Sequence, residues 1–196
     1  MSGASGVKRY ILTGTPGAGK TTILTALAAL GYRTVAEAAT EVITAEQAQG
    51  EPAPWTRADF IDRIVTVQRE RQLQSEAQHR LEPRGRIETQ LHDRSPICTH
   101  ALGVFLNRPV SPALTAELDR ITRERVYQPQ VFFVRNLGFC EPTAARRISF
   151  ADSLEFERIH ERSYRAFGFE LIDVPAAPLA ERVAQIHRRL TAITVS

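Results

Sequence analysis

Residues 14–22 read GTPGAGKTT, and this short stretch decides the fold. It matches the pattern G-x-x-x-x-G-K-[ST] at every fixed position, with Gly14, Gly19, Lys20 and Thr21 at those positions. Glycines let backbone N–H groups approach a phosphate chain closely, and a helix that starts at the loop adds further donors and a partial positive charge. The stretch therefore predicts a loop that binds the phosphates of ATP or GTP.

The residue types of this loop suggest separate tasks. Lys20 is expected to reach the β- and γ-phosphates, and the Thr21 hydroxyl is expected to bind Mg²⁺. The other predicted nucleotide-binding residues of the loop are Gly14, Pro16, Gly17, Ala18, Gly19 and Thr22. An apolar run before the loop and a helical pattern after it supply the strand-to-helix setting that the motif requires.

Strand and helix patterns alternate along the whole chain, which predicts an α/β fold with five parallel strands and helices on both faces. We expect strands at residues 8–13, 32–35, 87–91, 130–134 and 170–174. Helices are expected at 21–30, 37–48, 56–78, twice within 97–124, at 149–167 and at 179–192. Thr56, with Asp59 three positions later, predicts a capping box at the start of the third helix. We interpret residues 1–6 as a frayed tail and residues 7–196 as one domain.

The composition is that of an ordinary globular protein. The chain has 196 residues, a formal charge of +3 and 43% hydrophobic residues, and no apolar run approaches the length of a membrane helix. We therefore expect a cytoplasmic protein without a membrane partner. Arginine supplies most of the positive charge, but no basic stripe with interleaved aromatics predicts a nucleic-acid partner. Cys98 and Cys140 lack metal-ligand spacing and are expected to be free thiols.

Two acidic positions are candidates for chemistry beside the phosphate loop. Asp93 ends the third expected strand, where a carboxylate could hold the Mg²⁺ water shell, and Arg94 could contact transferring phosphate oxygens. The alternative is a surface Asp–Arg ion pair. Glu37 follows the second strand and could accept a proton from a substrate hydroxyl, with Glu41 one helical turn further on. The alternative is that both glutamates are ordinary first-turn charges. We interpret His92 as structural.

Several arginines in the second half of the chain could form a closing segment. Arg146 and Arg147 lie in a stretch with few periodic apolar residues, so we predict a lid at about 136–150 that brings them to the developing charge. The alternative is a solvated basic segment. The helix that follows carries Arg158, Arg162 and Arg165 on one face, where pairing with Glu155 and Glu161 is the alternative to phosphate contact. Pro175, after the last strand, could border the adenine ring.

The phosphate loop, together with VAEAATEVI (35–43), HDRSP (92–96) and RRISFADSLEFERIHERSYRAFGFELIDVP (146–175), resembles the small bacterial AAA_28 family. That family is related to the nicotinamide-riboside kinase domain and is similar to nucleoside and nucleotide kinases. The resemblance implies strand order 2-3-1-4-5, a helical substrate region at about 37–85 and an arginine lid. It also implies that Asp93 serves Mg²⁺, that Arg94 serves the transferred phosphoryl or the attacking hydroxyl, and that Glu37 occupies the position of the base in deoxynucleoside kinases.

Three functions are compatible with these residues. The first is a Mg²⁺-dependent kinase that moves the γ-phosphoryl of ATP or GTP to a hydroxyl or phosphate of a small acceptor such as a nucleoside, a vitamin or an antibiotic. The second is an NTP-hydrolysing switch, although no separate motif for positioning water is present. The third is a kinase that acts on nucleic-acid ends. The sequence does not define the acceptor, the choice between ATP and GTP, or the oligomeric state.

Overall fold

The computed structural model describes residues 6–81, 88–138 and 149–195. Its strands are β1 (Val7–Thr13), β2 (Arg33–Val35), β3 (Glu88–Asp93), β4 (Gln130–Val134) and β5 (Glu170–Val174). Its helices are α1 (Lys20–Ala29), α2 (Ala38–Ala48), the 3₁₀ turn η1 (Pro54–Thr56), α3 (Phe60–Leu81), α4 (Pro96–Phe105), α5 (Pro112–Arg123), α6 (Phe150–Ala166) and α7 (Leu179–Val195).

The five strands form one parallel sheet in the order β2-β3-β1-β4-β5. Strand β1 is central and pairs with β3 on one side and β4 on the other, with Leu12 opposite both Asp93 and Phe132. This arrangement confirms the predicted strand order and the parallel sheet. Because all strands run in the same direction, their carboxyl ends meet at one edge of the sheet.

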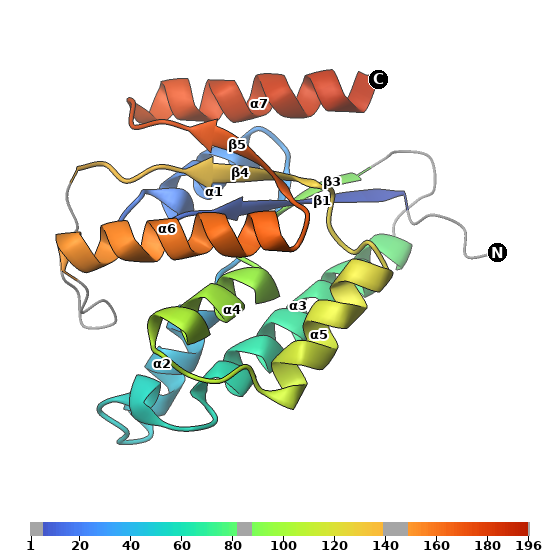
Figure 1. Ribbon diagram of the computed structural model, residues 1–196. Coiled ribbons are helices and arrows are strands. Elements are labelled where there is room, and N and C mark those ends of the chain that lie inside the picture. The colour runs from blue at the N-terminus through green and yellow to red at the C-terminus, as the bar shows by residue number, and fades with distance from the viewer. Residues whose placement is uncertain (1–5, 82–87, 139–148, 196) are drawn as a thin grey trace.

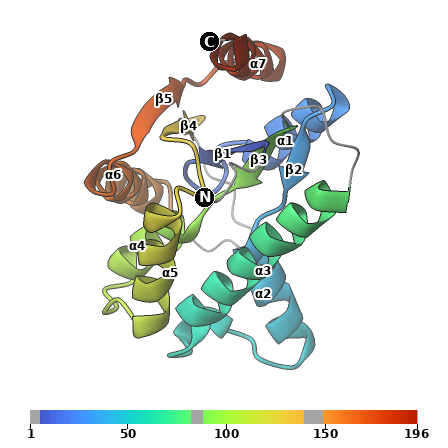
Figure 2. The same ribbon diagram turned by 90° about the vertical axis from the view of Figure 1, so that its right-hand side faces the viewer.

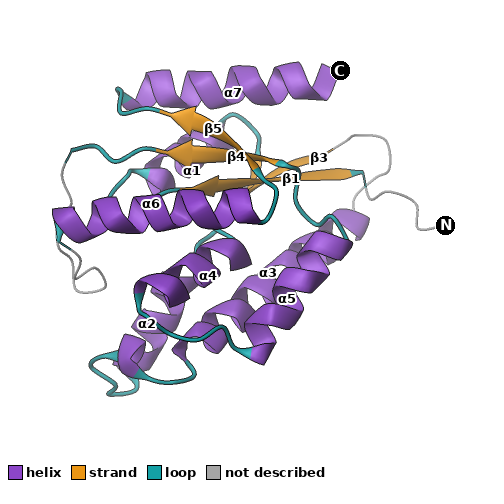
Figure 3. Ribbon diagram, in the orientation of Figure 1, coloured by secondary structure: helices purple, strands orange, loops and turns teal. Residues whose placement is uncertain are grey.

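Alternating side chains of β1 pack into two separate cores, one on each face of the sheet. Tyr10 and Leu12 face a core completed by α1 and α7, while Ile11 faces a second core shared with α2, α3, α4, α5 and Tyr164 of α6. Figure 3 shows the helices on both faces of the sheet, and Figure 1 places α7 opposite α4 and α6. Seen from the end of the sheet, α2 to α5 form an extra layer beneath it (Figure 2).

Most predicted element boundaries lie within a few residues of the observed ones, but the start of the third helix was predicted wrongly. Thr56 belongs to η1, and its hydroxyl donates to the Ala53 carbonyl at 2.8 Å. Asp59 instead receives two hydrogen bonds from the Arg57 guanidinium, and α3 begins only at Phe60. Pro54, at the start of η1, fixes a tight turn there, so the local turn replaces the capping box.

Along α3, the side chains of Phe60, Ile61, Ile64 and Val65 recur at helical spacing and are all buried. Ser149 is the N-cap of α6, and its hydroxyl accepts a hydrogen bond from the Asp152 backbone N–H. Within the described part of the chain, none of the helices is long and apolar enough to cross a membrane.

Candidate active site

The phosphate loop connects the end of β1 to the start of α1, as the motif predicts. Gly14, Gly17 and Gly19 have φ angles of 136°, 84° and 82°, which L side chains rarely adopt. Gly14 also lies against the end of β4, so a Cβ there would stand 2.2 Å from the Val134 carbonyl oxygen. Gly19 is the N-cap of α1. The loop geometry therefore requires glycine for both conformation and space.

Lys20 is the buried cation of this loop. In the free chain its ammonium donates to the Thr15 carbonyl at 2.8 Å, and its side chain is one of those that line the central cavity. Burial, with a contribution from the Arg94 charge, lowers the pKa of Lys20 to about 8. Thr21, by contrast, is exposed and lines the same cavity.

Asp93 is the last residue of β3 and is almost fully buried. Its Oδ1 atom has no hydrogen-bond partner among the described residues. Burial, reinforced by the negative charge of Glu37, raises the pKa of Asp93, although Lys20 opposes this. Asp93 thus has a carboxylate oxygen without a partner, and it lies near the Lys20 ammonium. Such an oxygen could accept a hydrogen bond from a water molecule on a Mg²⁺ ion that is bound chiefly by nucleotide phosphates. The Mg²⁺ roles of Thr21 and Asp93 stay predictions, and of the two only Thr21 lines the cavity.

In the described part of the chain, no cluster of three or more His, Cys, Asp or Glu side chains could hold a metal ion on its own.

Arg94 follows β3 with a backbone φ of 71°, an unusual value for a residue other than glycine. Its backbone N–H donates to the Leu12 carbonyl at 3.0 Å, which fixes the turn. Its guanidinium forms an ion pair with the Glu37 carboxylate and lies 3.0 Å from the Cys98 sulfur. Burial opposes the charge, but Cys98, Glu37 and Asp93 outweigh it and raise the pKa of Arg94. Arg94 therefore pairs across the site, and not with Asp93 at the surface as the alternative interpretation held.

Glu37 occupies the N-cap position of α2, directly after β2. Its carboxylate accepts a hydrogen bond from the Thr40 hydroxyl at 2.9 Å, and Arg71 donates to its carbonyl oxygen at 2.6 Å. Burial alone would raise its pKa, but the charges of Arg94 and Lys20 lower it overall, so the group is a carboxylate at neutral pH. Glu41 pairs with Arg71 and does not line the central cavity, in line with an ordinary helix charge.

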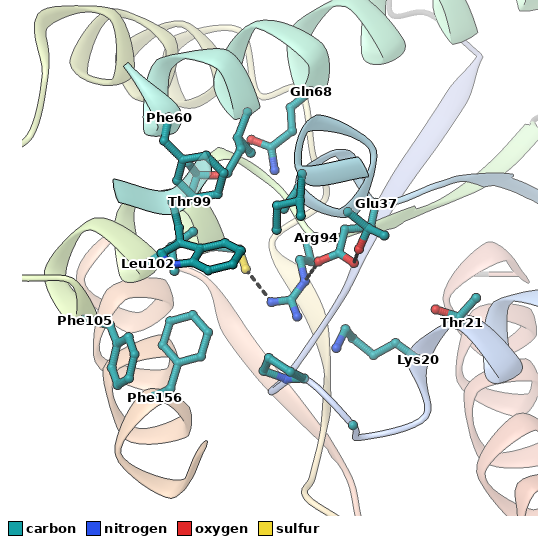
Figure 4. Close-up of a pocket in the computed structure, with 18 of the residues that line it drawn as sticks. Lys20, Thr21, Glu37, Phe60, Gln68, Arg94, Thr99, Leu102, Phe105 and Phe156 are labelled. Carbon is teal, nitrogen blue, oxygen red and sulfur yellow. Dashed lines mark hydrogen bonds and ion pairs between the residues drawn. The ribbon is translucent and has the colours of Figure 1, made fainter. Parts of the chain in front are cut away.

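A single cavity of about 550 Å³ joins the phosphate loop to an aromatic chamber. Figure 4 shows Arg94 and Glu37 between Lys20 on one side and Phe60, Phe105 and Phe156 on the other. The side chains that line the chamber come from η1, α3, α4 and α6: Trp55, Phe60, Ile64, Gln68, Cys98, Thr99, Leu102, Phe105 and Phe156. The chamber and the loop are therefore parts of one continuous site.

The polar groups of the chamber are held in defined orientations. The Thr99 hydroxyl donates to the Gln68 amide oxygen at 2.9 Å, which leaves the Gln68 NH₂ group for other partners. His160 lies 2.9 Å from the Phe156 carbonyl through Nδ1 and 2.8 Å from the Cys98 sulfur through Nε2. A carbonyl can only accept, so Nδ1 carries the proton and the Cys98 thiol donates to Nε2. Burial and the nearby Arg94 charge lower the pKa of His160 to about 3, which keeps the ring neutral.

Sequence reasoning missed this chamber. Trp55, Phe60, Phe105 and Phe156 are spread over four elements, and each fits the apolar face of its own segment. The rings come together only because α3, α4 and α6 pack against one site. The spacing of these residues along the chain does not predict that packing.

Several other polar residues do not line the cavity. Arg135, which directly follows β4, forms ion pairs with Glu157, Glu161 and Asp173. His92 is buried, with its ring 5.2 Å from that of Tyr127 and its pKa lowered to about 3 by burial, as expected of a structural residue.

The basic face of α6 is exposed, and Arg158, Arg162 and Arg165 pair with Glu155 and Glu161, which favours the solvated-face alternative. Pro175 is exposed after β5 and does not line the cavity, so its place beside the adenine ring stays a prediction. Arg146, Arg147 and Cys140 lie outside the described residues. Cys98 is a free thiol, as expected.

The chain was compared with known proteins. Residues 9–182 match the family model AAA_28, described as an AAA domain. No curated protein sequence matches the chain. Among solved structures, deoxyadenosine kinase from M. mycoides with products dCMP and a flexible dCDP bound gives a TM-score of 0.62 at 18% identity, covering 94% of this chain and 99% of that one.

The same kinase with bound dCTP gives a TM-score of 0.55 at 16% identity, with the same coverage of both chains. With bound dATP it gives 0.52 at 18% identity, covering 93% of this chain and 99% of that one. At these identities the likeness establishes the fold: a P-loop sheet and helices arranged as in a nucleoside kinase.

Proposed function

Because this chain belongs to the AAA_28 family of AAA domains and has a nucleoside-kinase fold, we propose that it is a Mg²⁺-dependent kinase. It transfers the γ-phosphoryl group of ATP or GTP to a hydroxyl of a small, planar, nucleoside-like acceptor. The observation that carries the proposal is the continuous cavity, in which the phosphate loop opens into an aromatic chamber across the Glu37–Arg94 pair.

The nucleotide side of the site is formed by the loop and the start of α1. Backbone N–H groups of the loop and the Lys20 ammonium bind the phosphates, and Lys20 leaves the Thr15 carbonyl to do so. Thr21 and Asp93 would hold Mg²⁺ with the β- and γ-phosphates. When bound, Mg²⁺ neutralises phosphate charge that would otherwise repel the attacking oxygen.

The acceptor side is formed by residues of the predicted substrate region, 37–85, together with residues of α4 and α6. Aromatic rings favour a flat, largely apolar ligand, and the oriented Gln68 amide supplies a donor for a heteroatom of that ligand. Among the described residues, the only charged side chains that line the cavity are Lys20, at its phosphate end, and Glu37 and Arg94, where the loop and the chamber meet. The chamber therefore favours an acceptor that is uncharged away from its reacting hydroxyl.

Glu37 and Arg94 lie where the two halves meet, which suits the transfer step. The acceptor oxygen forms a bond to the γ-phosphorus while the bond to the nucleoside diphosphate oxygen breaks. Glu37 accepts the proton of the acceptor hydroxyl, and Arg94 stabilises negative charge on the moving phosphoryl oxygens. In the free chain these two side chains bind each other, so each is already positioned for its role.

The test is phosphoryl transfer from γ-labelled ATP and GTP with Mg²⁺, across a panel of nucleosides, nucleoside monophosphates, vitamins and antibiotics. We expect a labelled product with one or more nucleosides and none with the K20M variant. Release of free phosphate at a rate independent of any acceptor would contradict the proposal and favour a hydrolytic switch. Transfer to RNA or DNA ends, accompanied by a salt-sensitive gel shift, would instead favour a nucleic-acid-end kinase.

The acceptor chamber can be tested separately with W55A and F105A. Each removes a ring from the wall without touching the phosphate loop. We expect the acceptor KM to rise about 10-fold or more, because a buried aromatic contact contributes on the order of 1–3 kcal/mol. The ATP KM should stay within about twofold of the wild-type value. As a matched control, F150A removes an exposed ring of α6 that does not line the cavity.

A further inference from the structure

Arg182 is a buried arginine that packs directly on the phosphate loop, although no motif includes it. It lies in the first turns of α7 and is only 3% exposed. Its Nη2 donates to the Ala18 carbonyl at 2.7 Å, and a Cβ on Gly19 would lie 3.2 Å from its Nη1. The guanidinium thus covers the loop at Ala18 and Gly19, immediately before α1 begins.

The charge of Arg182 has no counter-charge in the described part of the chain. None of the described carboxylates forms an ion pair with it, its Nε atom is buried without a hydrogen-bond partner, and burial is the one cause that lowers its pKa. Other buried cations differ in this respect: Arg94 pairs with Glu37, and Arg9 lies 3.6 Å from a Glu76 carboxylate oxygen. A buried cation without an anion is unfavourable in the free protein.

The surroundings make this imbalance larger. The positive end of the α1 dipole and the Lys20 ammonium lie at the same loop, so the free chain gathers positive charge there. Lys20 has Asp93 and Glu37 nearby to offset its charge, whereas Arg182 does not. An anion at the loop would relieve the imbalance, and the phosphate chain of a nucleotide is such an anion.

We propose that Arg182 is a positioning residue of the nucleotide site that acts in two ways. Its hydrogen bond to Ala18 holds the loop in its phosphate-binding shape, and its unpaired charge adds affinity for the phosphate chain. The inference rests on the proposed nucleotide site but not on the identity of the acceptor. It implies that α7, the last helix of the chain, contributes to nucleotide affinity.

The test is equilibrium binding of ATP and of inorganic tripolyphosphate to full-length R182M, R182K and the wild type. Tripolyphosphate carries the charge of the phosphate chain without a base or sugar. We expect R182M to weaken both ligands by a similar factor, about 10- to 100-fold, as for loss of a charged hydrogen-bonding partner. R182K should recover part of this loss because it restores the charge. R188M, which removes an exposed arginine of α7, is the matched control.

Thermal melting without ligand separates a charge effect from simple damage to the fold. The melting temperature of free R182M should not fall below that of R188M, since removal of an unpaired buried charge offsets the lost hydrogen bond. Tripolyphosphate affinity equal to that of R188M would overturn the proposal. So would a strongly lowered melting temperature of R182M that R182K fails to restore, which would mean a packing role alone. If the wild type binds ATP but transfers no phosphoryl group, the kinase proposal fails, and the binding data alone decide the role of Arg182. If the wild type binds neither ATP nor tripolyphosphate, both the kinase proposal and the Arg182 proposal are overturned.

Discussion

Raising the pH should weaken nucleotide binding and, over the same range, stabilise the free protein, and both effects arise from Lys20. Burial first, and then the Arg94 charge, lower the pKa of Lys20 to about 8. Phosphate binding requires the charged ammonium, so a ligand must bind to the protonated fraction of the chain. That fraction falls steeply above pH 8.

The size of the affinity effect follows from linkage of one proton to binding. The apparent Kd for ATP should rise about 30-fold between pH 7 and pH 9.5, because each pH unit above the pKa costs about a factor of ten. Most of the rise should occur above pH 8. Below pH 7, the protonation of Lys20 is complete and contributes no further change.

The stability of the free chain should change in the opposite direction. The pKa of Lys20 is lower in the folded chain than its ordinary value of 10.5, so the unfolded state binds more protons between about pH 8 and 10.5. Stability therefore rises with pH through that window, by on the order of 3 kcal/mol in total. Below pH 8 the charged ammonium imposes its full penalty on the folded state. Other groups also titrate there, so the difference from a variant without the ammonium is the informative quantity.

The assay combines calorimetric ATP titrations from pH 7 to 9.5 with urea unfolding in the absence of nucleotide. K20R keeps its charge throughout this range, so its ATP affinity should be flat with pH even if it is weaker. K20M lacks the titrating group, and subtracting its unfolding free energy should isolate the Lys20 contribution. The reasoning is refuted if the wild-type affinity falls no more steeply than that of K20R. That result would mean that the ammonium keeps its ordinary pKa in the folded chain.

Further predictions concern the loop, the base and the metal. G14A should melt about 4–8 °C below G50A. Both glycines have positive φ angles, but only at Gly14 would an added Cβ clash with backbone atoms, those of Val134. Equal melting temperatures of the two variants would contradict the argument for close approach. E37Q should lower kcat by about 10²- to 10⁴-fold with little change in ATP affinity, whereas E41Q should behave as the wild type; a small loss of kcat in E37Q would leave Glu37 only a positioning role. D93N should weaken ATP binding about 10-fold or more with Mg²⁺ but not in its absence, and an equal loss in both conditions would argue against a metal role for Asp93.

Local patterns were enough to predict the sheet and the loop. The strand from Gln130 to Val134 is a short apolar run that ends where the buried strand ends, and both bounds were predicted. Both bounds of β5, Glu170–Val174, were also predicted, although of its residues only Val174 is buried. Strands of a parallel sheet that is covered on both faces read as short apolar runs, and the strand order followed from the family resemblance. Proximity of Glu37 and Asp93 could also be expected, since Glu37 follows β2 and Asp93 ends β3 at the same edge of the sheet.

The partners of those residues could not be predicted in the same way. Arg94 turns toward Glu37 because its backbone adopts a left-handed conformation directly after β3. An arginine in the sequence does not indicate such a conformation, so this turn could not be predicted. Thr56 shows the opposite failure: its pattern suited a helix cap, yet the tight turn at Pro54 uses its hydroxyl instead. The aromatic chamber and Arg182 depend on how helices distant in sequence pack together.

The central position of β1 has a consequence for the synthesis of the chain. The phosphate loop follows β1, but β1 pairs with β3 and β4, which are translated much later. Gly14 lies against the last residue of β4, and Arg182 of α7 closes the loop from near the carboxyl terminus. Pairing between strands that are far apart in the sequence slows folding, and it leaves apolar strands exposed until their partners are translated. A nascent chain halted before β4 should therefore bind no nucleotide although it carries the whole motif, and the completed chain acquires its loop only in the last stage of folding.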